Sequence, residues 1–228
     1  MTLQEVIAVC KQLLLQSKVR KGLAVAPEIT QPLQTARTSG LPSLTTLSDK
    51  ITLDTKTANP FLRISNDQRR LRSYTYEESQ ILMKTDWFER ASEKYDGWLC
   101  IRGVQGFSSG QHYWEVDIRG IRDWRIGVMR ESAPKRGFAK LNTSSGYWTL
   151  RLQLGNLVAL TEPATKLNIS LPSRVGVCLD MQAGEVTFYA IDKKMRREIY
   201  RFKADFSNSE KVYPVFGTVD TKKEMVII

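Results

Sequence analysis

Apolar and polar residues alternate in short runs over most of the chain. Val175, Val177 and Leu179 alternate with small or polar neighbours, and the pattern resumes with Val186 and Phe188 after a glycine turn. A period of two places every second side chain on the same face of a strand. This stretch therefore predicts a β-hairpin that turns one face toward a core.

Similar β-rich runs recur along the chain, separated by turn residues such as Gly120, Gly146 and Gly155. No segment after residue 49 has the period of a long helix. Short strands at this spacing are typical of an antiparallel sandwich. We therefore predict a mostly β protein built as a two-sheet antiparallel β-sandwich, with strands at residues 113–118, 124–129, 147–152, 157–160, 174–179, 185–190 and 213–216.

Residues 1–22 follow a different period. Apolar side chains recur there at three- and four-residue steps, as in an amphipathic helix, and include Val6, Ile7, Cys10, Leu13 and Leu14. A lone helix of this length is marginal in water, so we expect its apolar stripe to pack on the domain or on a second copy of the chain. A mitochondrial targeting helix is the alternative, which Glu5 disfavours.

Residues 23–49 carry several prolines and a glycine among Thr, Ser and Gln, with no sustained period. Such a composition is typical of a linker that runs partly extended over a surface. The predicted organisation is therefore an amphipathic helix at 1–22, which is a coiled-coil remnant or a packing helix, a linker at 23–49 and a β domain at 50–228.

The composition places the chain among globular proteins, with 228 residues, 42% apolar and 25% charged. It holds no run of about 20 apolar residues that would span a membrane, and its start lacks the order of a secretory signal. Cys10, Cys100 and Cys178 are scattered, which fits a reduced compartment better than a disulfide framework. We therefore expect a cytoplasmic location, with the nucleus as the alternative.

The formal net charge of +10 raises three classes of partner: a nucleic acid, an anionic membrane surface or an acidic protein. The basic residues come as short pairs, such as Arg69-Arg70 and Lys222-Lys223, and not as a long tract. This distribution favours a solvated basic rim.

A set of collinear motifs is more specific than the alternation. The stretch ITLDTKTANPFLRISND is followed by GFSSGQHYWEVDI, and then by WRIGVMRESAPKRG, SGYWTLRL, RVGVCLDMQAGEVTFYAI and VYPVFG. In this order the motifs resemble the PRY-SPRY domain, which is the C-terminal domain of many tripartite-motif proteins and of butyrophilins. The resemblance implies a concanavalin-like jelly roll, with PRY at about 50–104 and SPRY at about 105–228. Residues 69–94 look longer than usual for the family and are expected to form a long loop.

Bulky aromatic residues within these motifs are expected to anchor the core. Trp114, Trp124 and Trp148 stand at strand positions, where a large ring is more often buried than used as a platform for a ligand. The motifs therefore specify a scaffold, and the loops between them are free to specify a partner.

Catalytic and metal-binding chemistry finds little support in the sequence. His112 is the only histidine, and it stands at the start of a predicted strand, where a packed or edge histidine is favoured. One histidine and scattered cysteines cannot supply the ligands of a zinc RING domain. The stretch GVQGFSSG lacks the Gly-Lys-Ser/Thr ending of a phosphate-binding loop. We therefore predict a non-catalytic chain with no metal and no cofactor, whose parent protein carries any RING domain elsewhere.

The resemblance to tripartite-motif proteins also implies a peptide-binding site, carried over motif by motif. The matching positions are Glu131, Arg151, Gln153, Gly217, Thr218, Val219 and Asp220. With the expected loop at 69–94 beside them, we predict one exposed recognition surface at one end of the sandwich. Butyrophilin relatives that sense phosphorylated metabolites use clustered basic residues, whereas Val158 and Ala164 occupy the flanking positions here, which argues against an anion pocket of that type.

The functional hypothesis is a protein-interaction module that recognises a target protein through surface loops. The resemblance implies the substrate-recognition part of a tripartite-motif ubiquitin ligase, in innate immunity or protein turnover, with self-association through the N-terminal helix and no small-molecule substrate. The alternative is a basic module that binds RNA or an anionic membrane surface directly. A steep fall in affinity with salt would favour the alternative.

Overall fold

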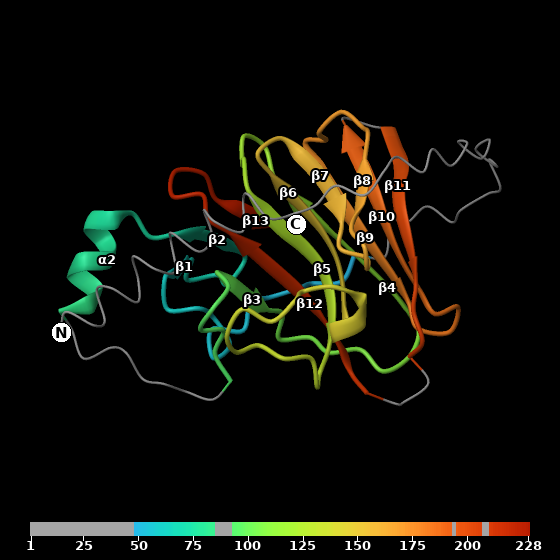
Figure 1. Ribbon diagram of the computed structural model, residues 1–228, viewed down its shortest axis with the longest axis horizontal. Helices are drawn as coiled ribbons and strands as arrows, with labels where there is room; N and C mark the ends of the chain where they lie inside the picture. The colour runs from blue at the N-terminus through green and yellow to red at the C-terminus, as the bar shows by residue number, and fades with distance from the viewer. Residues whose placement is uncertain (1–47, 85–92, 193–194, 207–209) are drawn as a thin grey trace.

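The computed structural model describes residues 48–84, 93–192, 195–206 and 210–228, which form two antiparallel β-sheets packed face to face (Figure 1). The helix predicted at 1–22 and almost all of the predicted linker lie outside the described residues. The prediction that the helix packs on the domain or on a second copy therefore stays a prediction.

One layer is a seven-stranded sheet in which every paired strand is antiparallel to its neighbours. In spatial order its strands are β1 (Leu62–Ile64), β2 (Arg70–Ser73), β13 (Met225–Ile227), β4 (Gln111–Asp117), β9 (Arg174–Asp180), β10 (Glu185–Asp192) and β11 (Met195–Lys203).

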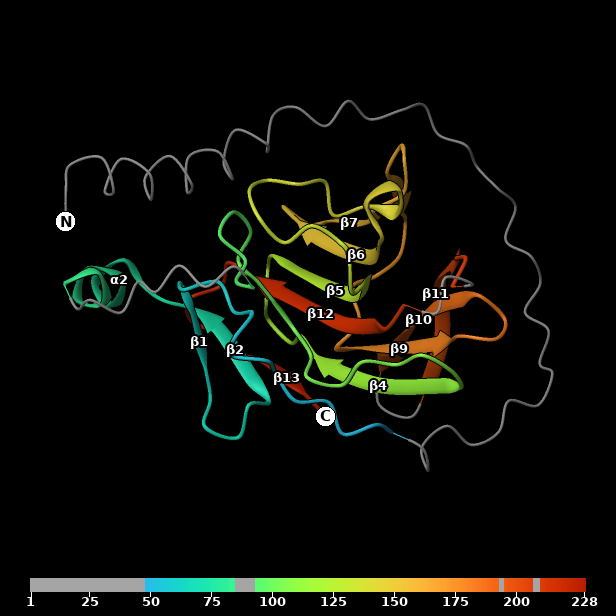
Figure 2. The same ribbon diagram turned by 90° about the horizontal axis from the view of Figure 1, so that it is seen from below.

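The other layer is a six-stranded antiparallel sheet, and Figure 2 shows the two layers nearly edge-on. In spatial order its strands are β3 (Cys100–Arg102), β12 (Val212–Thr218), β5 (Trp124–Arg130), β6 (Tyr147–Gln153), β7 (Asn156–Ala159) and β8 (Thr165–Leu167). A short 3-10 helix (Thr143–Ser145) precedes β6. All strands predicted from the sequence are confirmed, with ends that differ by one or two residues.

The segment at 69–94 is not the single long loop that the sequence suggested, because it contains β2 and an α-helix, α2 (Tyr76–Met83). Thr75 and Glu78 form a capping box at the start of α2, and Arg72 binds the Glu78 carboxylate through two nitrogens. These hydrogen bonds lower the pKa of Glu78 to about 2. The helix stands at the β1–β2 edge of the seven-stranded sheet (Figure 1).

The main core lies between the sheets, as the alternation predicted. Trp114 and Trp124 are fully buried there and Trp148 is nearly so, which confirms all three as core anchors. His112 stacks on Phe107 with ring centroids 3.7 Å apart, the packed arrangement expected of it. Alternation predicted these buried positions correctly because the inward side chains of two facing sheets exclude water independently of the loop conformations.

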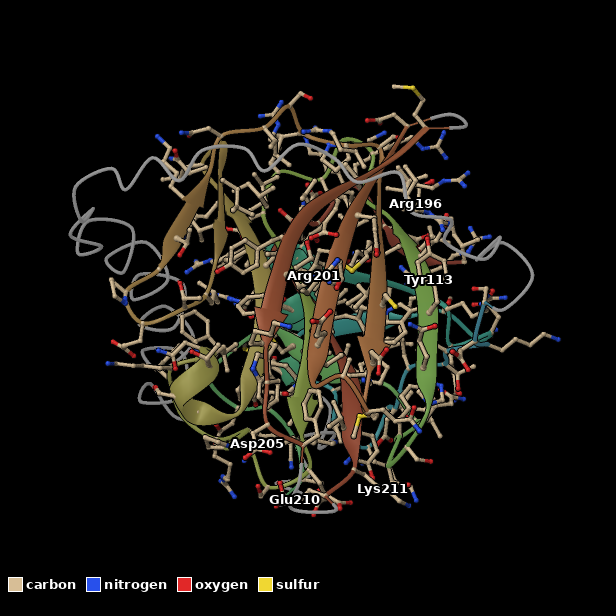
Figure 3. The ribbon with its side chains drawn as sticks, turned by 90° about the vertical axis from the view of Figure 1, so that its right-hand side faces the viewer. Tyr113, Arg196, Arg201, Asp205, Glu210 and Lys211 are labelled. Carbon is tan, nitrogen blue, oxygen red and sulfur yellow. The ribbon has the colours of Figure 1, made fainter. Side chains whose placement is uncertain are left out.

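Two smaller apolar clusters lie on the outer faces of the sheets. Tyr95, Met129 and Tyr147 belong to the cluster outside the six-stranded sheet. The cluster outside the seven-stranded sheet contains Tyr113, which Figure 3 labels, and Tyr189. Within the described ranges, no helix is long and apolar enough to cross a membrane, and no His, Cys, Asp or Glu residues gather in the number that a metal site needs.

Candidate functional site

A row of paired residues crosses the outer face of the six-stranded sheet. Gly217 of β12 pairs with Cys100 of β3 and with Arg125 of β5, and Arg125 pairs with Arg151 of β6. Trp124 and Ile126 flank Arg125 and belong to the main core, so alternation turns Arg125 outward. Residues directly opposite in a sheet point to the same side, so the two arginines lie next to each other on this face.

Trp98 covers this pair of arginines. The Arg125 guanidinium lies 4.1 Å from the centroid of the Trp98 ring, and that of Arg151 lies 5.8 Å from it. Phe138 meets the same ring edge-on, with centroids 5.4 Å apart. Arg125 and Arg151 are only 5% and 6% exposed, whereas Phe138 is 42% exposed. We call these four residues, Trp98, Arg125, Phe138 and Arg151, the Trp98 surface.

Two segments that are distant in sequence hold the Trp98 surface in place. The Trp98 indole donates to the Ala139 carbonyl at 2.8 Å, and the Gly137 N–H donates to the Asp96 carboxylate. Further along, the Tyr147 hydroxyl donates to the Pro134 carbonyl at 2.7 Å. Residues 95–98 and the loop at 131–141 are thus bonded to each other and to the sheet, which fixes the aromatic rings over the arginines.

The electrostatics of the Trp98 surface are those of a binding site and not of an acid–base site. Two like charges lie side by side out of water, and stacking on the Trp98 ring offsets part of that cost. Burial raises the pKa of the Cys100 thiol, and Arg125 and Arg151 oppose the rise without reversing it. A neutral thiol is a poor nucleophile, so the arrangement offers aromatic contact and positive charge.

Comparison with known proteins identifies the family. The model of the SPRY domain matches residues 111–228, and that of the SPRY-associated domain, PRY, matches residues 51–107. The chain belongs to the SPRY domain family. Its PRY-SPRY domain is of the tripartite-motif and butyrophilin type, a type that serves generally as a protein-interaction module.

Curated relatives include butyrophilin subfamily 1 member A1 of Mus musculus, 38% identical over 140 residues, which are 61% of this chain and 25% of that protein. Nuclear factor 7, brain, of Xenopus laevis is 35% identical over 176 residues, which are 76% of this chain and 26% of that protein. The chain therefore spans about a quarter of the length of these relatives.

Solved structures agree on the fold. The TRIM65 PSpry domain superposes with a TM-score of 0.67 at 20% identity, covering 90% of this chain and 99% of that one. Stonustoxin superposes with a TM-score of 0.66 at 21% identity, covering 81% of this chain and 28% of that one. At these identities the likeness shows the sandwich fold alone.

Most of the site residues predicted from the sequence lie at one end of this PRY-SPRY domain, close to the Trp98 surface. Gln153 ends β6 and is half-buried, and Gly217 and Thr218 end β12 and are buried. The half-buried Val219 and Asp220 follow, and the backbone carbonyl of Asp220 accepts a hydrogen bond from Ser73 of β2. Their role in binding a partner stays a prediction.

Glu131 does not join them, which corrects the expectation of one continuous surface. Arg125 begins β5, whereas Glu131 follows its last residue, so the two lie at opposite ends of the sandwich, about 20 Å apart along the strand. The Tyr213 hydroxyl donates to the Glu131 carboxylate at 2.9 Å, near the start of β12. The transfer from family motifs failed here because it did not follow the direction of the strand.

The expected exposure of Arg151 is also wrong. Its side chain does point away from the main core, but Trp98 and its segment cover it. The sequence reading missed Trp98, Arg125 and Phe138. Arg125 carried a signal, because a charged residue between two inward-facing residues must lie on the outer face. Trp98 and Phe138 carried none, since only the folded contact between their segments brings them together.

Proposed function

We propose that this PRY-SPRY domain recognises a target protein through the Trp98 surface, as the substrate-recognition part of a tripartite-motif ubiquitin ligase. The observation that carries the proposal is the exposed Phe138 ring, which meets edge-on the Trp98 ring that stacks on the buried Arg125 guanidinium. Aromatic residues and arginine are enriched among the residues that dominate binding energy in protein interfaces.

The chemistry of the Trp98 surface suggests what its target presents. Phe138 offers apolar contact area, and Arg125 brings a positive charge to the Trp98 ring that Phe138 contacts. A target segment with an apolar side chain beside a carboxylate would complement both features. Gln153, half-buried at the end of β6, would add hydrogen-bonding capacity at the rim.

The test compares Phe138→Ala with Val104→Ala, an equally simple truncation of an exposed apolar residue in the loop that follows β3. Proteins captured from cell lysate by the wild-type chain are quantified for both variants, and the affinity of the strongest candidate is then measured by calorimetry. Phe138→Ala should weaken binding by more than about 1 kcal/mol. Both variants should keep their stability within about 0.5 kcal/mol of wild type.

Normal binding by Phe138→Ala, together with normal binding by Arg125→Met, would show that the target reads another surface. The ligase role has a separate readout in the parent protein. Ubiquitylation of the captured target should fall with Phe138→Ala in proportion to the loss of affinity. Unchanged ubiquitylation at reduced affinity would contradict the substrate-recognition role.

A further inference from the structure

Three exposed apolar side chains gather at the end of the sandwich where β6, β8 and β10 finish and β9 and β11 begin. Leu154 lies at the tip of the β6–β7 hairpin, Leu171 in the crossing from β8 to β9, and Met195 at the start of β11. We call this the Leu154 end; it lies at the top of Figure 1. Single exposed apolar residues are ordinary on protein surfaces, so grouping alone decides nothing.

Leu154 adds a second observation, because its backbone is strained. Leu154 and Gly155 form a two-residue turn between Gln153 and Asn156, with φ of 50° and 77°. Such turns favour Asn-Gly, because the left-handed region costs a branched residue such as leucine about 1 kcal/mol. Leu154 bears this cost while remaining 64% exposed. Neither the turn nor the core therefore explains the choice of leucine.

Charge is the third observation. Several basic side chains near the strand termini of the Leu154 end have no ion-pair partner within the part of the chain that the structure describes; they are Arg122, Lys166, Arg197, Lys222 and Lys223. Toward the opposite end, Lys140 pairs with Glu162 and Lys203 with Glu185. Figure 3 shows two acidic residues, Asp205 and Glu210, and one basic residue, Lys211, at that opposite end.

We propose that the Leu154 end is a docking surface for an anionic lipid bilayer. Leu154, Leu171 and Met195 enter the interface between headgroups and acyl chains, and the unpaired lysines and arginines around them bind the anionic headgroups. Isolated apolar tips inside a basic rim combine the two terms that peripheral membrane binding requires, which are buried apolar area and attraction to negative charge.

A bilayer fits these observations better than RNA or a protein. Proteins that bind single-stranded RNA stack its bases on aromatic rings, whereas the exposed apolar side chains here are aliphatic or a thioether. A protein interface has a contiguous buried centre, whereas these side chains come from separate connections. Gln153 directly precedes Leu154, so a domain docked by its Leu154 end would hold the rim of the Trp98 surface beside the bilayer, with Phe138 on the outer face of the six-stranded sheet.

The test uses the full chain and vesicles of phosphatidylcholine with phosphatidylserine, compared with vesicles of phosphatidylcholine alone. Two variants test the two contributions separately. Leu154→Asn removes apolar area, and Lys222→Gln with Lys223→Gln removes positive charge. Their controls away from the Leu154 end are Val104→Asn, which also replaces an exposed apolar residue by Asn, and Lys211→Gln, which removes one charge and is therefore compared with the fivefold effect per charge (Figure 3 labels Lys211). Because the predicted amphipathic helix at 1–22 could itself bind vesicles, only the contrast between these variants is decisive.

Wild type should bind the anionic vesicles and release them as salt is raised. Leu154→Asn should weaken binding about tenfold while raising the melting temperature, since Asn suits the turn. The double lysine variant should weaken binding about 25-fold, at about fivefold per charge. The proposal is overturned if both vesicle types bind equally, if the Leu154-end variants match their controls, or if an RNA oligonucleotide binds tightly while anionic vesicles do not.

Discussion

Each sheet carries an arginine stacked on an aromatic ring on its outer face, yet the two arrangements differ in what neutralises the charge. Outside the seven-stranded sheet, Arg196 lies 4.7 Å from the centroid of Tyr113 and 3.6 Å from the Glu115 carboxylate (Figure 3). Glu115 in turn accepts a hydrogen bond from the Tyr113 hydroxyl at 2.9 Å. Outside the six-stranded sheet, Arg125 stacks on Trp98 with no ion-pair partner among the described residues.

The difference teaches how the same pair of residue types can serve two purposes. Outside the seven-stranded sheet, the Glu115 carboxylate neutralises the positive charge of Arg196. The cluster around Tyr113 therefore offers a partner little unpaired charge to bind. At the Trp98 surface Arg125 has no ion-pair partner among the described residues, and the Trp98 ring that covers it contacts the exposed Phe138 ring. The counter-charge, and not the stacking, therefore separates a structural contact from a recognition surface.

Two glycines sharpen the comparison because each lies close to another part of the chain on its own face. A Cβ on Gly97 would lie 1.8 Å from the backbone oxygen of Gly137, where the segments covering the six-stranded sheet meet. A Cβ on Gly176 would lie 2.6 Å from the Tyr113 hydroxyl, outside the seven-stranded sheet. A Cβ on Gly97 would clash with backbone atoms, which can move only with their whole segment. A Cβ on Gly176 would clash with the end of a side chain, which can shift alone.

Gly97→Ala should therefore cause the largest loss of stability, about 3 kcal/mol or more, and should detach the cover over Arg125. Gly176→Ala should cost about 1 kcal/mol, because the Tyr113 ring can shift. Urea unfolding measures both, and amide exchange of residues 133–141 shows whether the cover has opened. A Gly97→Ala protein as stable as Gly176→Ala would mean that the two segments are not packed on each other as described.

The arginines provide the next contrast, in which stability and binding should respond in opposite ways. Arg196→Met leaves the mostly buried Glu115 carboxylate with the Tyr113 hydroxyl and, as its remaining cation, Arg174 at 3.7 Å, so the variant should lose about 1–2 kcal/mol of stability. Arg125→Met removes a buried charge, and the new thioether can still contact the Trp98 ring, so stability should change by less than about 0.5 kcal/mol. Thermal and urea unfolding check both values.

Target binding should show the reverse order. Arg125→Met should weaken it by more than about 1 kcal/mol, whereas Arg196→Met should leave it unchanged once folding is accounted for. If Arg125→Met unfolds the protein and Arg196→Met does not, the charge of Arg125 is neutralised by a group within the folded protein. The distinction between the two faces would then fail.

The sequence predicted the parts of the fold that depend on local patterning. The hairpin around Gly184 and the burial of Trp114 follow from alternation, which acts whatever the loops do. Helix α2 was missed although its capping box, Thr75 with Glu78, is a local signal. The Trp98 surface could not be predicted from local patterns, because it depends on contacts between segments about 40 residues apart in sequence.

Alkaline pH tests whether the outer faces of both sheets are closed to water. Burial raises the pKa of Tyr95, beside Tyr147, well above its ordinary value near 10, and burial with the Glu115 hydrogen bond raises that of Tyr113. A raised pKa gives stability that is fully present below pH 10 and lost as the pH rises, by about 1.4 kcal/mol per pH unit for each tyrosine. Tyr95→Phe and Tyr113→Phe should each flatten the fall in unfolding free energy between pH 10 and 11 by about 1 kcal/mol, because the unfolded tyrosine is only half ionised at pH 10. If only Tyr113→Phe flattens it, Tyr95 ionises freely in the folded protein, and the cluster of Tyr95, Met129 and Tyr147 is open to water.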